Sequence, residues 1–177
     1  MFSEFMSELN IRKATLADVN LISALAITTH YEAYFELDPS HDLADYCINF
    51  FNLETVKSEL ENPKQTYFIV EFQGNAVGFF LPREGKKIAC MEGKNAIELQ
   101  RIYLIEKMKG KKIGKMMIEK SGEVGREKGY ETLWLGVWDK NVEAQRFYEK
   151  IGMKNVGVTD FSDGKNSFIN FVFAKDI

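Results

Sequence analysis

The middle of the sequence, residues 97–138, limits the possible folds more than any other part. Ile97–Ile105 reads as a strand because β-branched and aromatic residues recur in it, and Tyr130–Trp138 reads as another. Between them, apolar residues at helical spacing predict a helix from about Ile113 to Lys128. A strand, a helix and a second strand in this order form a crossover, which places the chain among the α/β folds.

The rest of the chain adds helices and an antiparallel front. A capping-box pattern at Thr15–Asp18 predicts a helix whose apolar residues share one face, and Asn141 is a good N-cap for a helix that ends at Gly152. The other expected elements are a strand at Leu9–Lys13, one or two helices in residues 32–62 that end at Pro63, a hairpin of Thr66–Phe72 and Ala76–Leu81 around Gln73-Gly74-Asn75, a polar loop at Arg83–Lys94, and two last strands flanking the turn signal Asp163-Gly164.

Composition indicates one domain over residues 1–177, because the chain is long enough to bury a core and no linker interrupts it. A formal net charge of −3 argues against a general nucleic-acid binder. The amino terminus lacks a basic leader pattern, and no apolar run approaches the ~20 residues of a membrane span. A cytoplasmic protein without membrane association is therefore expected.

The cysteines and histidines predict neither a disulfide framework nor a metal site. Cys47 and Cys90 lie far apart in the sequence, and no metal-ligand spacing links His30 to His41. We therefore expect no bound metal, and ordinary surface or half-buried roles for both histidines.

A lysine-rich loop, Lys109–Gly114, joins the strand to the helix of the crossover. Exposed backbone N–H groups at a helix start favour anions, and the helix dipole adds positive potential there. Five lysines in residues 107–115 face only one acid, Glu106. The lysine loop therefore predicts a polyanionic, phosphate-bearing ligand, with a solvated surface loop as the alternative.

An acidic segment, residues 32–62, is the opposite electrostatic pole. It holds eight acidic residues against Lys57 alone, which is a net charge of −7, and aromatic residues are interleaved with the carboxylates. Such a segment would attract a cationic chain through its carboxylates and its ring faces. The alternative is a solvated face of one or two acidic helices.

Three segments in the second half of the chain carry a family resemblance: Arg101-Ile102-Tyr103-Leu104, the lysine loop and Asn141-Val142-Glu143-Ala144-Gln145-Arg146-Phe147-Tyr148-Glu149-Lys150-Ile151-Gly152-Met153. On these residues the chain resembles the GNAT superfamily of acetyl-CoA-dependent N-acetyltransferases. The family's phosphate signature is Gln or Arg, two residues, Gly, one residue, then Gly or Ala; the chain matches it at Gly114 and departs from it at Lys109 and Lys112. Leu133-Trp134-Leu135-Gly136-Val137-Trp138-Asp139-Lys140-Asn141 resembles the PaiA-like polyamine acetyltransferase branch.

The resemblance implies a GNAT-type α/β fold: a mixed, mostly antiparallel central sheet flanked by helices, with the acetyl-CoA site on the crossover. Acetyl-CoA is implied as cosubstrate. The residues implied to bind it are Ile102, Tyr103, Leu104, Lys109, Gly110, Lys111, Lys112, Ile113, Gly114, Lys115, Asn141, Ala144 and Phe147.

The resemblance implies one catalytic role, and the chemistry of amine acetylation suggests a second. Tyr148 matches the family's general acid near the sulfur, with a core tyrosine as the alternative. An amine with a pKa of ~10.4 must lose a proton before it attacks, and Glu98 is the candidate base, directly or through water. Glu98 has the alternative of a strand carboxylate paired with a neighbouring cation, and Glu92 and the acidic segment are other proton acceptors. Asn141 reads both as an N-cap and as a contact to the pantetheine arm.

We therefore expect acetyl transfer to a primary amine by direct attack in a ternary complex. A small cationic amine, a polyamine such as spermidine, is the expected acceptor. A peptide or protein amine is the alternative acceptor, and a non-catalytic CoA sensor is the alternative function. Monomer and homodimer both stay open.

Overall fold

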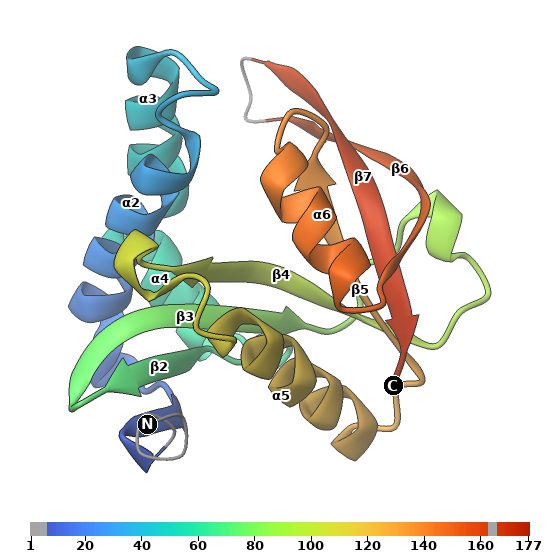
Figure 1. The fold of residues 1–177 in the computed structure, drawn as a ribbon, viewed down its shortest axis with the longest axis horizontal. Helices are drawn as coiled ribbons and strands as arrows, with labels where there is room; N and C mark the ends of the chain where they lie inside the picture. Colours follow the sequence, from blue (N-terminus) through green and yellow to red (C-terminus); the bar gives the residue numbers. More distant parts are fainter. Residues whose placement is uncertain (1–6, 163–165) are drawn as a thin grey trace. The chain divides into compact units, whose positions relative to one another are not determined.

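The computed structural model describes residues 7–162 and 166–177. Its strands form a seven-stranded sheet in the order β1-β2-β3-β4-β5-β7-β6. The strands β2 to β7 are labelled in Figure 1. The strands β4 and β5 run parallel, whereas the pairs β1–β2, β2–β3, β5–β7 and β6–β7 are antiparallel. The expected mixed, mostly antiparallel α/β fold with a strand-helix-strand crossover is therefore confirmed.

The helices and strands have the following bounds. The strands are β1 (Leu9–Lys13), β2 (Phe68–Phe72), β3 (Asn75–Arg83), β4 (Ala96–Leu104), β5 (Thr132–Trp138), β6 (Lys154–Ser162) and β7 (Ser167–Asp176). The α-helices are α2 (Val19–Tyr34), α3 (Ser40–Phe50), α4 (Leu53–Glu61), α5 (Ile113–Glu127) and α6 (Val142–Lys150). Short 3-10 helices are η1 (Leu16–Asp18), η2 (Ala89–Met91) and η3 (Glu106–Met108).

The chain folds as two compact units. The first comprises the described residues up to Leu81 together with Arg101–Gly114, and the second comprises Pro82–Gln100 and Lys115–Ile177. The elements β3, β4 and α5 each begin in one unit and end in the other, so the units share continuous elements instead of a linker. The single-domain expectation for residues 1–177 stays a prediction.

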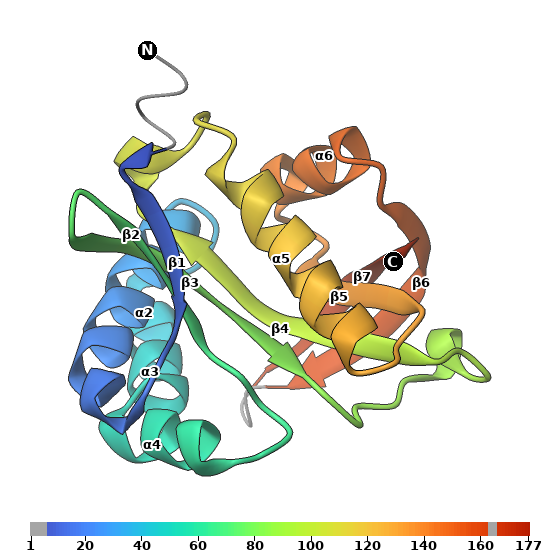
Figure 2. The ribbon, with the colours of Figure 1, turned by 90° about the horizontal axis from the view of Figure 1, so that it is seen from below.

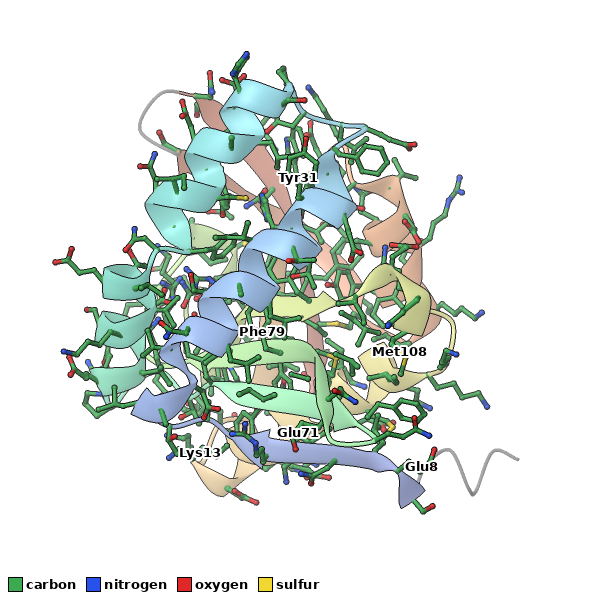
Figure 3. All side chains as sticks on the ribbon, turned by 90° about the vertical axis from the view of Figure 1, so that its left-hand side faces the viewer. Glu8, Lys13, Tyr31, Glu71, Phe79 and Met108 are labelled. Carbon is green, nitrogen blue, oxygen red and sulfur yellow. The ribbon has the colours of Figure 1, made fainter. Side chains whose placement is uncertain are left out.

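In the first unit, an apolar face of α2 packs against strands. Ile22 and Ala26 are fully buried and belong to one hydrophobic cluster with Ile69 of β2 and Phe79 of β3. Figure 3 shows α2 lying across these strands in front of Phe79. The predicted apolar face of this helix is therefore confirmed.

The capping box predicted at Thr15–Asp18 is also present. The backbone N–H of Thr15 donates to Asp18 Oδ2 at 2.8 Å, and the Asp18 carboxylate also accepts from the Arg12 guanidinium at 2.8 and 2.9 Å. Hydrogen bonding to Arg12 lowers the pKa of Asp18 to about 2. Arg12 also reaches Glu71 of β2 at 2.7 Å, so the cap connects the start of the helix to the sheet.

In the second unit, the mid-helix glycines of α5 permit close packing, as the sequence indicated. A Cβ on Gly125 would lie 2.5 Å from Ile177 Cδ1 and 2.9 Å from Ile97 Cγ2 of β4. A Cβ on Gly122 would lie 3.1 Å from Ile177 Cγ2. Figure 2 shows α5 beside β4 and β5. Each glycine therefore lowers the helix propensity of α5 but permits closer packing against its neighbours.

Several predicted boundaries need correction. The expected polar loop Arg83–Lys94 begins with the last residue of β3 and contains η2, because β3 continues through the buried Pro82. The strand predicted to end at Ile105 ends at Leu104. Residues 32–62 form the end of α2 and both helices α3 and α4. The turn signal at Asp163-Gly164 lies outside the described residues.

Candidate active site

The lysine loop is held in a glycine-like backbone conformation. Gly110 has φ +75° and Lys112 has φ +66°, so both lie in the left-handed region. Lys112 therefore keeps a backbone angle typical of glycine although it carries a side chain, at a strain of about 1–2 kcal/mol. Ile113, which begins α5, is 1% exposed and anchors the loop to the interior. The departure at Lys112 leaves the glycine-like backbone in place.

Charge on the lysine loop is mostly exposed. Lys111, Lys112 and Lys115 lie in exposed positions, and Lys109 Nζ forms an ion pair with Glu106 Oε2 at 2.6 Å. The backbone of a helix start and several ammonium groups therefore occur together over residues 109–115, which fits the diphosphate of coenzyme A. These residues suit the cosubstrate that the sequence implied.

The last residues of β4, Ile102–Leu104, are here called the strand end. The parallel register of β4 with β5 runs over Ala96–Glu98, and the strand end follows it in the chain. A Cβ on Gly78 of β3 would lie 2.6 Å from the carbonyl oxygen of Tyr103, so only glycine permits this approach of the two backbones. The backbone N–H of Ile105 donates to Val77 O at 2.9 Å and continues the link to β3.

A buried histidine contacts the strand end. His30 Nδ1 lies 3.1 Å from the Tyr103 hydroxyl, and its ring stacks on Tyr46 with centroids 4.4 Å apart. Burial, with a smaller effect from the Arg101 charge, lowers the pKa of His30 to about 3. His30 is therefore neutral at physiological pH. The sequence placed it as an ordinary surface or half-buried residue, whereas it is 7% exposed and in the interior.

Glu98, the candidate base, is buried and paired. It is 8% exposed, and its Oε2 accepts from Arg83 Nε at 2.6 Å and lies 2.6 Å from Arg83 Nη2. Burial raises the pKa of Glu98, against the opposing effect of Arg83 and, more weakly, Lys86. The alternative interpretation, a strand carboxylate bound to a neighbouring cation, describes its contacts in this structure. The sequence analysis did not find Arg83, because it lies 15 residues away across a loop.

The helix α6 carries the other sequence-predicted residues. Asn141 Oδ1 accepts from the backbone N–H of Ala144 at 3.1 Å, and Gly152 has φ +85°, so the predicted N-cap and C′ residue are confirmed. Tyr148 is 6% exposed, and its ring contacts Phe147 at 5.2 Å and Phe173 of β7 at 5.9 Å between centroids. The core contacts foreseen as the alternative for Tyr148 are thus present, and they fix its ring.

The carboxylates of the acidic segment differ in exposure and pairing. Glu36, Asp45, Glu54 and Glu61 lie in exposed positions. Glu59 instead forms an ion pair with Arg101 at 2.6 Å in the interior. The net charge of −7 therefore overstates the charge that faces solvent.

Neither a metal centre nor a membrane-spanning helix is found within residues 7–162 and 166–177. This part of the chain contains no group of three or more His, Cys, Asp or Glu side chains arranged to hold a metal ion. Among the same residues, no helix is long and apolar enough to cross a membrane.

Comparison with known proteins identifies the family. The profile of the acetyltransferase (GNAT) family matches residues 25–153, more than half of the chain. The chain is 24% identical over 170 residues to an uncharacterized N-acetyltransferase in the pepI 3′ region of Lactobacillus delbrueckii subsp. lactis, covering 96% of this chain and 98% of the relative. It is 26% identical over 148 residues to the uncharacterized N-acetyltransferase YjgM of Escherichia coli K12, covering 82% of each.

A solved structure shares the fold. The crystal structure of the PaiA N-acetyltransferase from Thermoplasma acidophilum in complex with coenzyme A superimposes with a TM-score of 0.77 at 22% identity, over 96% of this chain and 99% of that one. The chain therefore belongs to the acetyltransferase (GNAT) family and is an acetyl-CoA-dependent N-acetyltransferase. The expected family, enzyme class and cosubstrate are confirmed, and the PaiA-like branch stays a prediction.

Proposed function

We propose that the enzyme transfers acetyl from acetyl-CoA to a primary amine, with a polyamine such as spermidine as acceptor. The observation that carries this proposal is the lysine loop, whose left-handed Gly110 and Lys112 directly precede the start of α5. The start of this helix and the exposed lysines beside it suit a diphosphate. The family membership then assigns that diphosphate to the acetyl donor.

The family resemblance assigns cosubstrate contacts to residues in each of the two units, segment by segment. The lysine loop and Lys115 bind the diphosphate, and the backbone of the strand end binds the pantetheine arm and the oxygen of the acetyl group. Asn141, Ala144 and Phe147 of α6 contact the arm from the start and middle of a capped helix. When bound, the cosubstrate supplies an activated acetyl group, and the residues supply orientation and charge stabilisation.

Tyr148 acts as the general acid and Glu98 as the general base. The Tyr148 hydroxyl donates to the sulfur as negative charge develops there, and the packing of its ring on Phe173 fixes its direction. Glu98 accepts a proton from the acceptor ammonium, directly or through water. Because burial raises its pKa, Glu98 is a stronger base than an exposed carboxylate.

The charge and the rings of the first unit support a cationic acceptor. Exposed carboxylates are present on α3, on α4 and in the connection that follows α2, and Tyr31 and Phe35 are 44% and 56% exposed on the last turn of α2 and just after it. Carboxylates and aromatic faces both attract ammonium groups. A peptide or protein amine has the same charge, so it is the second candidate acceptor.

An amine panel tests the activity. Thiol release from acetyl-CoA is measured with polyamines, diamines, amino acids and basic peptides, and we expect the highest kcat/KM with spermidine. Highest activity with peptides would move the assignment to the second candidate. Tight CoA binding by calorimetry, with no thiol release for any amine of the panel, would identify a sensor instead of an enzyme.

A tyrosine pair tests the mechanism. Tyr148→Phe should lower kcat by about 10²-fold or more while leaving CoA affinity nearly unchanged, because the hydroxyl acts only as charge develops. Tyr130→Phe is the matched control, since the Tyr130 hydroxyl donates to Glu84 at 3.2 Å outside the proposed machinery. Equal kcat in Tyr148→Phe and the wild type would remove Tyr148 from the mechanism.

A further inference from the structure

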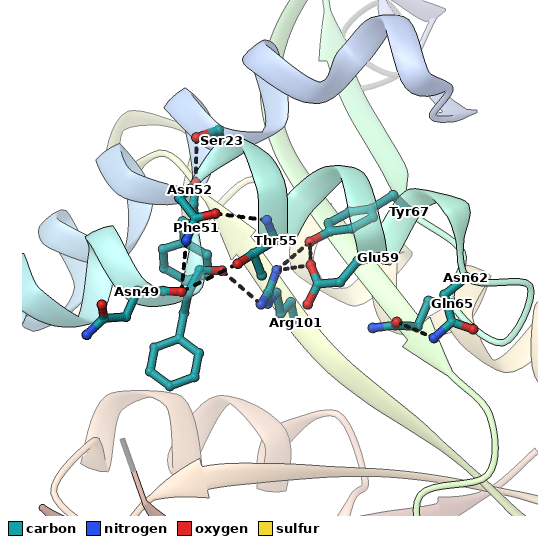
Figure 4. A network of polar contacts seen from close by, with 11 residues as sticks. Ser23, Asn49, Phe51, Asn52, Thr55, Glu59, Asn62, Gln65, Tyr67 and Arg101 are labelled. Atoms are coloured by element: carbon teal, nitrogen blue, oxygen red, sulfur yellow. Dashed lines mark hydrogen bonds and ion pairs between the residues drawn. The ribbon is translucent and has the colours of Figure 1, made fainter. Parts of the chain in front are cut away.

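A buried arginine directly precedes the strand end. Arg101 is 8% exposed, and its Nη1 donates to Glu59 Oε2 at 2.6 Å and to the Tyr67 hydroxyl. Its Nη2 donates to the carbonyl oxygen of Phe50 at 3.2 Å, and its guanidinium carbon lies 4.9 Å from the centroid of the Phe51 ring. Figure 4 shows Glu59 and Tyr67 beside the guanidinium.

The network is closed on itself. Tyr67 is 1% exposed, and its hydroxyl donates to Glu59 Oε2 at 2.5 Å. Burial raises the pKa of Tyr67 well above its usual value, so the hydroxyl stays protonated and acts as a donor. Arginine, carboxylate and phenol therefore satisfy one another in the interior, where an unpaired member would be costly.

The partners of Arg101 come from elements distant in the sequence. Phe50 ends α3, Glu59 lies in α4, and Tyr67 precedes β2 by one residue, at separations of 51, 42 and 34 residues from Arg101. All belong to the first unit. The side chain of Arg101 thus connects β4 to two helices and to the residue that precedes β2.

The residues that follow Arg101 are held from other directions. Gly78 lets the backbone of β3 approach the Tyr103 carbonyl, and the Tyr103 hydroxyl lies 3.1 Å from His30 Nδ1. A strand that only needed to be stable would not require an arginine here, because a buried ion pair contributes little or nothing relative to well-packed apolar residues. The planar guanidinium instead fixes the orientation of the backbone at Arg101, because it makes several contacts of set geometry at once.

We propose that Arg101 is a positioning residue: its contacts with Glu59, Tyr67 and Phe50 set the backbone of the strand end for the acetyl donor. The inference deepens the proposed function, because it rests on the strand end binding the acetyl group. Arg101 itself touches no substrate in this proposal. It acts through the main chain of the three residues that follow it.

The test replaces the network with apolar residues of similar size. In the triple variant Arg101→Met, Glu59→Leu, Tyr67→Phe no charge is left buried without a partner, so the fold should survive. Arg12→Gln is the matched control, because Arg12 also joins two carboxylates in the first unit but lies in β1. Thermal denaturation of both variants confirms that each is folded.

Two readouts decide the outcome. Amide hydrogen exchange at Tyr103 and Leu104 should become at least ~10-fold faster in the triple variant and stay unchanged in the control. The kcat for acetyl transfer should fall about 100-fold, with the CoA dissociation constant within about threefold of wild type, because a misplaced donor costs turnover more than diphosphate binding.

The possible failures are distinguishable. Unchanged exchange in a folded triple variant overturns the positioning role, whatever the wild-type activity. Faster exchange with a kcat within about twofold of wild type also overturns it, because a misplaced acetyl donor should lower kcat far more than that. If wild-type protein acetylates no amine, the proposed function fails and this role for Arg101 falls with it, whereas retained wild-type turnover confines any failure to Arg101.

Discussion

The lysine loop and the strand end lie a few residues apart in the chain, yet they are built in different ways. The lysine loop is exposed, and its shape depends on the backbone angles of Gly110 and Lys112. The strand end depends on contacts with β3, α2 and, through Arg101, α3 and α4. A site for one cosubstrate thus combines a locally determined anion loop with a strand set by long-range packing, and the two should respond to different substitutions.

The strand end should be most sensitive to added volume at Gly78. Gly78→Ala places a Cβ 2.6 Å from a backbone oxygen, which cannot move aside cheaply, and should lower the free energy of unfolding by about 2–3 kcal/mol. Gly136→Ala is the control, because its Cβ would meet nothing closer than 3.5 Å. Urea denaturation compares the two, and equal stabilities would show that β3 does not constrain the strand end.

The strand end should also carry the stronger acid sensitivity. His30 has a pKa of about 3 in the folded state, against an ordinary histidine value of 6.5, so the unfolded state binds more protons between these values. Stability is therefore fully present above about pH 6.5 and falls as pH decreases, with a slope of up to ~1.4 kcal/mol per pH unit. His30→Phe should reduce this slope between about pH 6 and pH 4 in pH-dependent denaturation. An unaltered slope would contradict the neutral, buried state of His30.

The lysine loop should respond instead to backbone strain. Lys112→Gly and Lys112→Ala both remove one charge, but only glycine relieves the strain of the left-handed φ of +66°. We expect the glycine variant to be more stable than the alanine variant by about 1 kcal/mol, measured by thermal denaturation. CoA affinity, measured by calorimetry, should fall similarly in both. An alanine variant as stable as the glycine variant would show that the loop relaxes out of this conformation.

The smallest effect is expected from a single exposed lysine. Lys111→Gln should weaken CoA binding only ~threefold at low salt, and the difference should vanish near 1 M salt because exposed charges are screened. Lys64→Gln, at another exposed position of the first unit, should leave CoA binding unchanged. A loss of CoA affinity that persists at high salt would mean that Lys111 makes a specific contact. The lysine loop would then depend on specific contacts, as the strand end does.

Local signals in the sequence were enough to predict much of the architecture. The capping box at Thr15–Asp18, the N-cap at Asn141 and the C′ glycine at Gly152 each depend on residues within one helical turn, and all three are present. The apolar periodicity of α2 and the crossover through α5 follow from the same short-range patterns. The lysine loop was found for this reason, since its lysines and glycines are neighbours in the chain.

The partners of the buried charges were decided by the tertiary structure alone. Glu59 counted as one of eight acids in a cation-attracting segment, but it is paired with Arg101 from 42 residues away. The sequence did not indicate that Arg83, the last residue of β3, pairs with Glu98. It also did not indicate that His30 contacts Tyr103. The sequence determines the interactions that a residue can make within about one turn of backbone. Which buried charges pair in a low-dielectric interior depends instead on how segments distant in the chain pack together. No local pattern in the sequence indicates such a partner.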